Sequence, residues 1–128
     1  MIPKTITLYG IPNCDTVKKA RSWLTENGVD YVFHDFKKQG VPGELLPVWE
    51  KAVGWETLLN RKGTMWRKQD AATQAAVVDA ASAMALMQLQ ASVIKRPVVA
   101  WGDGRVSVGF STEAFADRLA ALHTTRLP

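Results

Sequence analysis

The chain has 128 residues, of which 47% are hydrophobic and 22% are charged, with a formal net charge of +4. This composition is typical of a globular protein and excludes the disordered classes, and the length predicts a single domain over residues 1–128. No uninterrupted run of about 18 apolar residues is present, which excludes a transmembrane helix.

The cysteine content and the charge also restrict the disulfides, the compartment and the partners that the chain can have. Cys14 is the only cysteine, so no intramolecular disulfide can form. The N-terminal residues lack the apolar stretch of a secretory signal, and with a free thiol this favours the reducing cytoplasm. The basic residues are scattered along the chain, which favours a solvated surface over a nucleic-acid interface. We therefore expect neither a membrane nor a nucleic-acid partner.

The first third of the chain predicts a βαβ unit. Residues 4–9 alternate polar and apolar side chains and include β-branched residues, as in a strand. A helix is expected from Asp15 to about Asn27, where Asn-Gly ends it. Residues 30–36 read as a second strand. The helical crossover predicts that the two strands are parallel.

The middle of the chain predicts a helical insertion over about residues 43–91. Apolar residues recur at helical spacing in 43–53, and a short helix is expected over 55–60. Residues 61–68 are expected to form a basic loop. The alanine-rich segment 71–91 contains no Gly or Pro and predicts two helices that meet near residues 79–82.

The last third predicts a ββα unit. Residues 97–101 and 105–108 are expected to form a hairpin around an Asp-Gly turn. Ser111 is the expected cap of a last helix that includes residues 113–122, followed by a frayed tail over 123–128. The predicted order is βαβ, helices, ββα, which indicates an α/β fold.

Cys14 lies between the first predicted strand and the first predicted helix. Unpaired backbone amides and the positive end of the helix dipole favour a thiolate at such a position, Lys18 one turn later adds to the effect, and Asp15 opposes it. The alternative is a small buried hydrophobic residue. The position of a resolving cysteine, three residues later, is Val17. Any disulfide of Cys14 is therefore intermolecular, with glutathione, a protein substrate or a second copy.

The segment around Pro97 is a second feature of interest. Pro97 precedes a late strand and is a candidate for a cis peptide bond. Lys95 and Arg96 beside it could hold an anion, and an arginine can do so with two parallel hydrogen bonds. Taken alone, these two basic residues would more often face solvent.

Two further patterns carry less information. The basic loop contains Trp66 among its cations, which suits either nucleic-acid binding or a solvated loop with a packed indole. His34 and His123 have no cysteine or carboxylate neighbours at the spacing of metal ligands. We expect no metal site, and no phosphate-binding glycine loop is present.

Four segments together resemble the ArsC/Spx family, and most closely its YffB branch. They are residues 9–21, 58–60, 66–68 and 94–97. The resemblance spans essentially the whole chain. It implies a thioredoxin-like fold with a helical insertion, with Cys14 as the redox thiol, Pro97 as the cis-proline and Arg96 as the arginine that contacts an anion.

Departures from the family pattern bear on the substrate. Arsenate reductases of this family surround the oxyanion with three arginines. Arg96 matches one of these positions, but Asn60 stands at the second, with Arg61 displaced by one residue, and the third falls at residues 108–111, which contain no arginine. The regulator branch, which binds RNA polymerase, carries a second cysteine where this chain has Val17.

The resemblance and the lone thiol together predict a monothiol, glutathione-dependent thiol–disulfide oxidoreductase. An arsenate reductase, or a non-catalytic regulator that binds a protein such as RNA polymerase, are the alternatives. No tightly bound cofactor is expected, the partners are glutathione or a protein mixed disulfide, and the chain is expected to be a monomer. Cys14 is the predicted nucleophile. The predicted substrate-binding residues are Asn13, Lys18, Asn60, Arg61, Arg96 and Pro97.

Overall fold

The computed structural model describes residues 5–126, with side chains as far as Leu122. The chain divides into two compact units, one made of residues 1–35 and 96–128 and the other of residues 36–95. The sequence predicted one domain over 1–128 with an insertion over about 43–91. The second unit begins earlier and ends later than that insertion, and the single-domain assignment stays a prediction.

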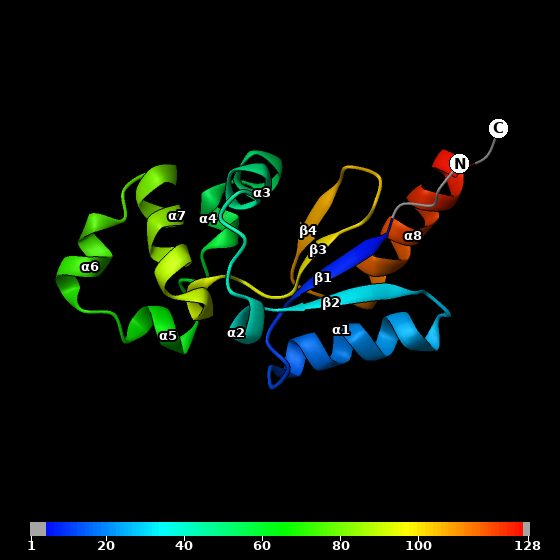
Figure 1. Ribbon diagram of the computed structural model, residues 1–128, viewed down its shortest axis with the longest axis horizontal. Coiled ribbons are helices and arrows are strands. Elements are labelled where there is room, and N and C mark those ends of the chain that lie inside the picture. The colour runs from blue at the N-terminus through cyan, green and yellow to red at the C-terminus, as the bar shows by residue number, and fades with distance from the viewer. Residues whose placement is uncertain (1–4, 127–128) are drawn as a thin grey trace. The chain divides into compact units, whose positions relative to one another are not determined.

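The first unit contains a four-stranded sheet and two helices (Figure 1). Its elements in chain order are β1 (Ile6–Gly10), α1 (Asp15–Glu26), β2 (Tyr31–Asp35), β3 (Val98–Ala100), β4 (Val106–Val108) and α8 (Thr112–Arg126). The strand order is β2-β1-β3-β4. β1 and β2 are parallel, and β3 is antiparallel to both β1 and β4. The predicted βαβ and ββα units are both confirmed.

Helices α1 and α8 pack on one face of this sheet. Leu8 and Val99 are register partners on β1 and β3, and both are fully buried. The rest of this core comes from the strands and from both helices: Ile6, Val17, Ala20, Leu24, Trp101, Phe115 and Leu122. Apolar residues at helical spacing on α1 therefore face the sheet, as the sequence predicts.

The second unit is helical. Its elements are α2 (Phe36–Gln39), α3 (Leu46–Val53), α4 (Trp55–Leu58), α5 (Thr64–Arg67), α6 (Ala71–Ala76), α7 (Ala80–Leu89) and the 3-10 turn η1 (Ala91–Val93). Asp70 and Asp79 cap α6 and α7 by accepting hydrogen bonds from backbone amides three residues later. The predicted break within residues 71–91 is thus present. An isolated bridge pairs Leu59 with Ile94.

Three local predictions are wrong. Phe36 was assigned to the second strand but begins α2, where its side chain is buried with its ring 6.3 Å from that of Trp49. The predicted loop 61–68 contains α5, closed by the hydrogen bond from Arg67 N to Gly63 O. The last helix continues to Arg126 rather than fraying from residue 123, because neither Gly nor Pro interrupts it. Residues 127–128 of the predicted tail lie outside the described part.

The helices within residues 5–126 are short or polar. None of those helices combines the length and the apolar character needed to cross a bilayer.

Candidate active site

The N-terminus of α1 positions Cys14. β1 ends at Gly10, three residues form a tight loop, and Cys14 is the N-cap with extended backbone angles, φ −96° and ψ 124°. Its carbonyl accepts the first intrahelical hydrogen bond, from Lys18 N at 2.9 Å. The half-buried thiol packs against the hydrophobic core of the first unit. Cys14 thus lies at the strand–helix junction that the sequence predicted.

The electrostatic surroundings of Cys14 come mainly from the backbone. The first-turn amides of a helix have no intrahelical acceptor, and the Cys14 side chain does not cap them in this conformation. These amides and the positive end of the helix dipole lie at the Cys14 end of α1. Lys18 and Asp15 are both exposed, so water screens their opposing effects on the sulfur.

The Arg96–Pro97 peptide bond is cis, which confirms the expectation for Pro97. Pro97 is buried and precedes Val98, the register partner of Tyr9 on β1. Because β3 runs antiparallel to β1, the start of β3 lies at the sheet edge where β1 ends. The Cys14 loop and the Arg96–Pro97 peptide therefore share this edge.

Arg96 and the residue that follows β4 lie at the same end of the sheet as the Cys14 loop. Arg96 is half-buried, and its Nε atom is inaccessible to solvent. Gly109 follows β4, and its N–H donates to the Pro97 carbonyl at 2.9 Å. This hydrogen bond ties the turn after β4 to the cis peptide.

The remaining predicted binding residues fall in different places. Asn13 is exposed in the loop before Cys14. Asn60 and Arg61 belong to the helical unit, where Asn60 N donates to Val93 O at 2.8 Å. The exposed Arg61 carries its guanidinium carbon 5.1 Å from the centre of a ring of Trp55. A role of Asn13, Asn60 and Arg61 in substrate binding stays a prediction.

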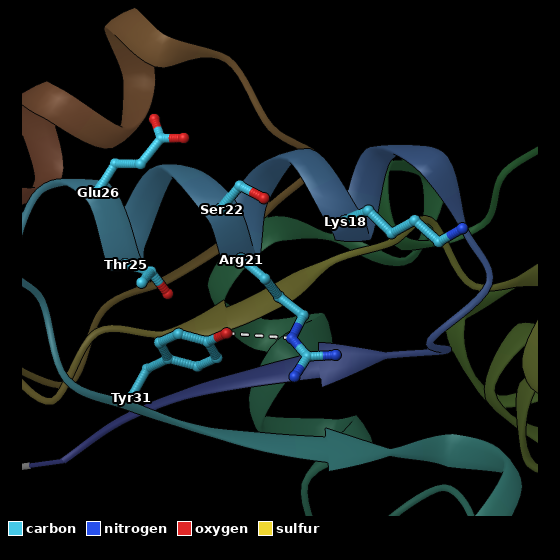
Figure 2. Close-up of a pocket in the computed structure, with 6 residues that line it drawn as sticks. All are labelled: Lys18, Arg21, Ser22, Thr25, Glu26 and Tyr31. Atoms are coloured by element: carbon cyan, nitrogen blue, oxygen red, sulfur yellow. Dashed lines mark hydrogen bonds between the residues drawn. The ribbon is translucent and has the colours of Figure 1, made fainter.

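A groove along α1 is a feature that the sequence reasoning missed. It is a shallow groove, open to solvent, with a volume of about 510 Å³, and it is lined by Lys18, Arg21, Ser22, Thr25, Glu26 and Tyr31 (Figure 2). Arg21 Nε donates to the Tyr31 hydroxyl at 3.0 Å. The spacing of Lys18 and Arg21 after Cys14 was visible in the sequence. Their approach to Tyr31 depends on how α1 lies beside β2.

Among the residues that the structure describes, no group of three or more His, Cys, Asp and Glu side chains could hold a metal ion. The chemistry available at the sheet edge is that of one thiol, a nearby arginine and backbone amides.

Comparison with known proteins gives consistent results. The model of the ArsC family matches residues 9–117. An uncharacterized protein of Haemophilus influenzae is 34% identical over 110 residues, which is 86% of this chain and 95% of that protein. The solved structure of a YffB protein is 50% identical, with a TM-score of 0.85 over 90% of this chain and 99% of that one.

A second solved structure is an arsenate reductase (ArsC) related protein from Brucella melitensis. It is 48% identical to this chain, with a TM-score of 0.71, and the match covers 91% of this chain and 96% of that one. These relatives support a thiol reductase role of the arsenate-reductase type. With a mixed four-stranded sheet, a thiol at the N-terminus of α1 and a cis-proline before β3, the protein has a thioredoxin-like fold and belongs to the ArsC family, in its YffB branch.

Proposed function

We propose that the protein is a monothiol thiol–disulfide oxidoreductase in which Cys14 is the nucleophile and glutathione is the co-substrate. One observation carries this proposal: the only cysteine of the chain is the N-cap of α1, at the sheet edge that also holds the cis Arg96–Pro97 peptide. A thiol against unpaired helix amides has the environment of a reactive cysteine.

The chemistry requires two exchange steps. The Cys14 thiolate attacks the glutathione sulfur of a mixed disulfide, a bond forms between these two sulfurs, and the substrate thiolate leaves with the electron pair of the broken bond. A second glutathione thiolate then attacks the glutathione sulfur now bound to Cys14. This step releases oxidised glutathione and restores the Cys14 thiolate. The substrate thiol is released in reduced form and one reduced glutathione is consumed. Its sulfur leaves joined to the glutathione sulfur of the original mixed disulfide, so no second protein cysteine is needed.

Binding of glutathione requires dispersed contacts, because the molecule carries two carboxylates and one ammonium group. Arg96 is the proposed carboxylate contact, since it is half-buried at the sheet edge that holds Cys14. Pro97 is proposed to line the site beside the disulfide. Asn13, which directly precedes Cys14, and Lys18, which follows it by four residues, are proposed as further contacts. A contribution of Asn60 and Arg61, which belong to the other unit, stays a prediction from the sequence.

Arsenate reduction is the second candidate, because one relative is described as arsenate reductase-related. Two of the three arginines of the family's oxyanion site are absent at the matching positions. Gly109, near the third position, has φ +83°, a backbone conformation that favours glycine over an arginine. Loss of charge-assisted contacts, each worth about 1.5–3 kcal/mol, disfavours arsenate.

Turnover with two substrates tests the proposal. Reduced protein is incubated with glutathione and a glutathione–peptide mixed disulfide, and separately with arsenate, glutathione and glutaredoxin. We expect Cys14-dependent release of peptide thiol in the first assay and no arsenite above the Cys14→Ser background in the second. Arsenite formation without disulfide turnover would reverse the order of the two candidates. An inert Cys14 in both assays would favour a non-catalytic binding role.

A further inference from the structure

The groove on α1 continues the line of residues that starts at Cys14. Lys18, Arg21 and Thr25 follow Cys14 at spacings of four, seven and eleven residues, which places them on one face of the helix. All three line the groove. At a rise of 1.5 Å per residue, Arg21 lies about 10 Å along the axis from Cys14. The groove therefore presents two cations at successive turns beyond the thiol.

Arg21 is held in place by two contacts. Its Nε donates to the hydroxyl of Tyr31 at 3.0 Å, and its guanidinium carbon lies 4.1 Å from the centre of the Phe33 ring. Figure 2 shows the Arg21 and Tyr31 side chains directed toward each other between α1 and β2. Tyr31 and Phe33 themselves pack against the hydrophobic core. The guanidinium is thus preorganised, and less side-chain entropy is lost when it binds a ligand.

The two cations of the groove, Lys18 and Arg21, are not paired with carboxylates in the part of the chain that the structure describes. Glu26 also lines the groove, but Figure 2 shows its side chain on the opposite side of α1 from that of Arg21. The end of the groove nearer Cys14 is therefore cationic. Ser22 and Thr25 also line the groove and bring hydroxyl groups to it.

We propose that this groove binds a carboxylate of the disulfide substrate, with Arg21 as the residue that determines specificity. The inference rests on the proposed function of Cys14 and extends it to the substrate class: disulfides that carry a carboxylate about 10 Å from the attacked sulfur. Three extended residues span about this distance. The carboxylate belongs either to glutathione or to an acidic residue near the disulfide of a protein.

Binding of unreactive thioethers tests the inference separately from catalysis. The probes are S-methylglutathione and two blocked peptides, S-methylcysteine-Gly-Gly-Glu and the same peptide ending in Gln. Each is titrated into reduced protein while the Arg21 Nε–H resonance is followed by NMR. We expect this resonance to shift, and the Glu peptide to bind about fivefold more tightly than the Gln peptide, the upper range for a solvent-accessible ion pair.

Two variants with the same change in net charge identify the site. Arg21→Gln should abolish the preference for Glu over Gln. Lys19→Gln should preserve it, because Lys19 is exposed and does not line this groove. A shift with S-methylglutathione assigns the carboxylate to glutathione, and a shift with the peptide alone assigns it to a protein substrate.

Other outcomes overturn the inference. They are an unperturbed Arg21 resonance with all three probes, equal affinities for the two peptides, or equal losses in the two variants. Failure of the proposed function has a different signature: the peptides bind at Arg21, but disulfides of the corresponding cysteine peptides do not exchange with Cys14.

Discussion

Gly10 and Val17 are in direct contact where β1 ends and α1 begins. A Cβ atom at Gly10 would come 2.8 Å from Val17 Cγ2, closer than real Cβ contacts. Val17 is fully buried and cannot move aside without disturbing the core. The missing side chain of Gly10 allows this close approach where the strand leads into the helix that has Cys14 as its N-cap.

Gly10→Ala is therefore expected to destabilise the protein and to displace the start of α1. Overpacking of this kind lowers the free energy of unfolding by about 1–3 kcal/mol. Urea unfolding measures the stability, and the alkylation rate of Cys14 by iodoacetamide measures the displacement. Gly43→Ala is the control, since its Cβ would meet only the end of the flexible Gln88 side chain. Equal effects in both variants would refute the role of the Gly10 contact.

Arg96 is expected to affect substrate binding more than the reactivity of Cys14. Arg96→Gln removes the proposed carboxylate contact, so KM for a glutathione mixed disulfide should rise about tenfold while kcat changes little. Steady-state kinetics provide the test. Lys95→Gln removes an equal charge from an exposed neighbour and should leave KM nearly unchanged. A fall in kcat at constant KM would contradict the binding role.

The Trp101 indole is buried and donates from Nε1 to Ser107 Oγ at 2.9 Å. Ser107→Ala leaves this donor without its partner, and we expect a loss of about 1–3 kcal/mol in the free energy of unfolding. Ser107→Thr keeps the hydroxyl on a strand and should restore most of the stability. Urea denaturation curves of the two variants measure these free energies of unfolding. A Ser107→Ala variant as stable as the original chain would count against the hydrogen bond.

Acid should weaken the cap of α7. A hydrogen bond from the Ser82 backbone, and then one from its side chain, lower the pKa of Asp79 below the ordinary value of 3.8. Because the folded pKa is the lower one, the stabilisation is complete above the unfolded value of 3.8 and is lost as pH falls through the folded pKa. Asp79→Asn keeps a capping oxygen that does not titrate. Its unfolding free energy should depend less on pH below 3.8, and identical slopes would contradict this account.

The fold was largely predictable wherever a pattern extends over several residues. Val17, Ala20 and Leu24 recur at helical spacing, and α1 lies within one or two residues of its predicted bounds. Short elements lack such a pattern: α5 spans four residues, and Phe36 looks the same at the end of a strand as at the start of a helix. Phe36 is helical because its side chain is buried near Trp49, a contact that only the tertiary structure provides.

The candidate site was predictable where its signals are local in sequence. Cys14 is recognised from the junction of two neighbouring elements, and Pro97 from its place before a strand. Arg21 was not singled out, because its importance depends on Tyr31 and Phe33, which a strand brings beneath α1. Contacts between separate elements of this kind carry no periodic signal in the sequence.

Intact mass spectrometry after incubation with oxidised glutathione tests the central claim most directly. The account predicts that the reduced protein gains one glutathione, that peptide mapping places it on Cys14, and that added reduced glutathione removes it. The Cys14→Ser variant, with unchanged circular dichroism, should gain none. A native protein that forms no adduct under these conditions would contradict Cys14 as the nucleophile of a glutathione-dependent enzyme.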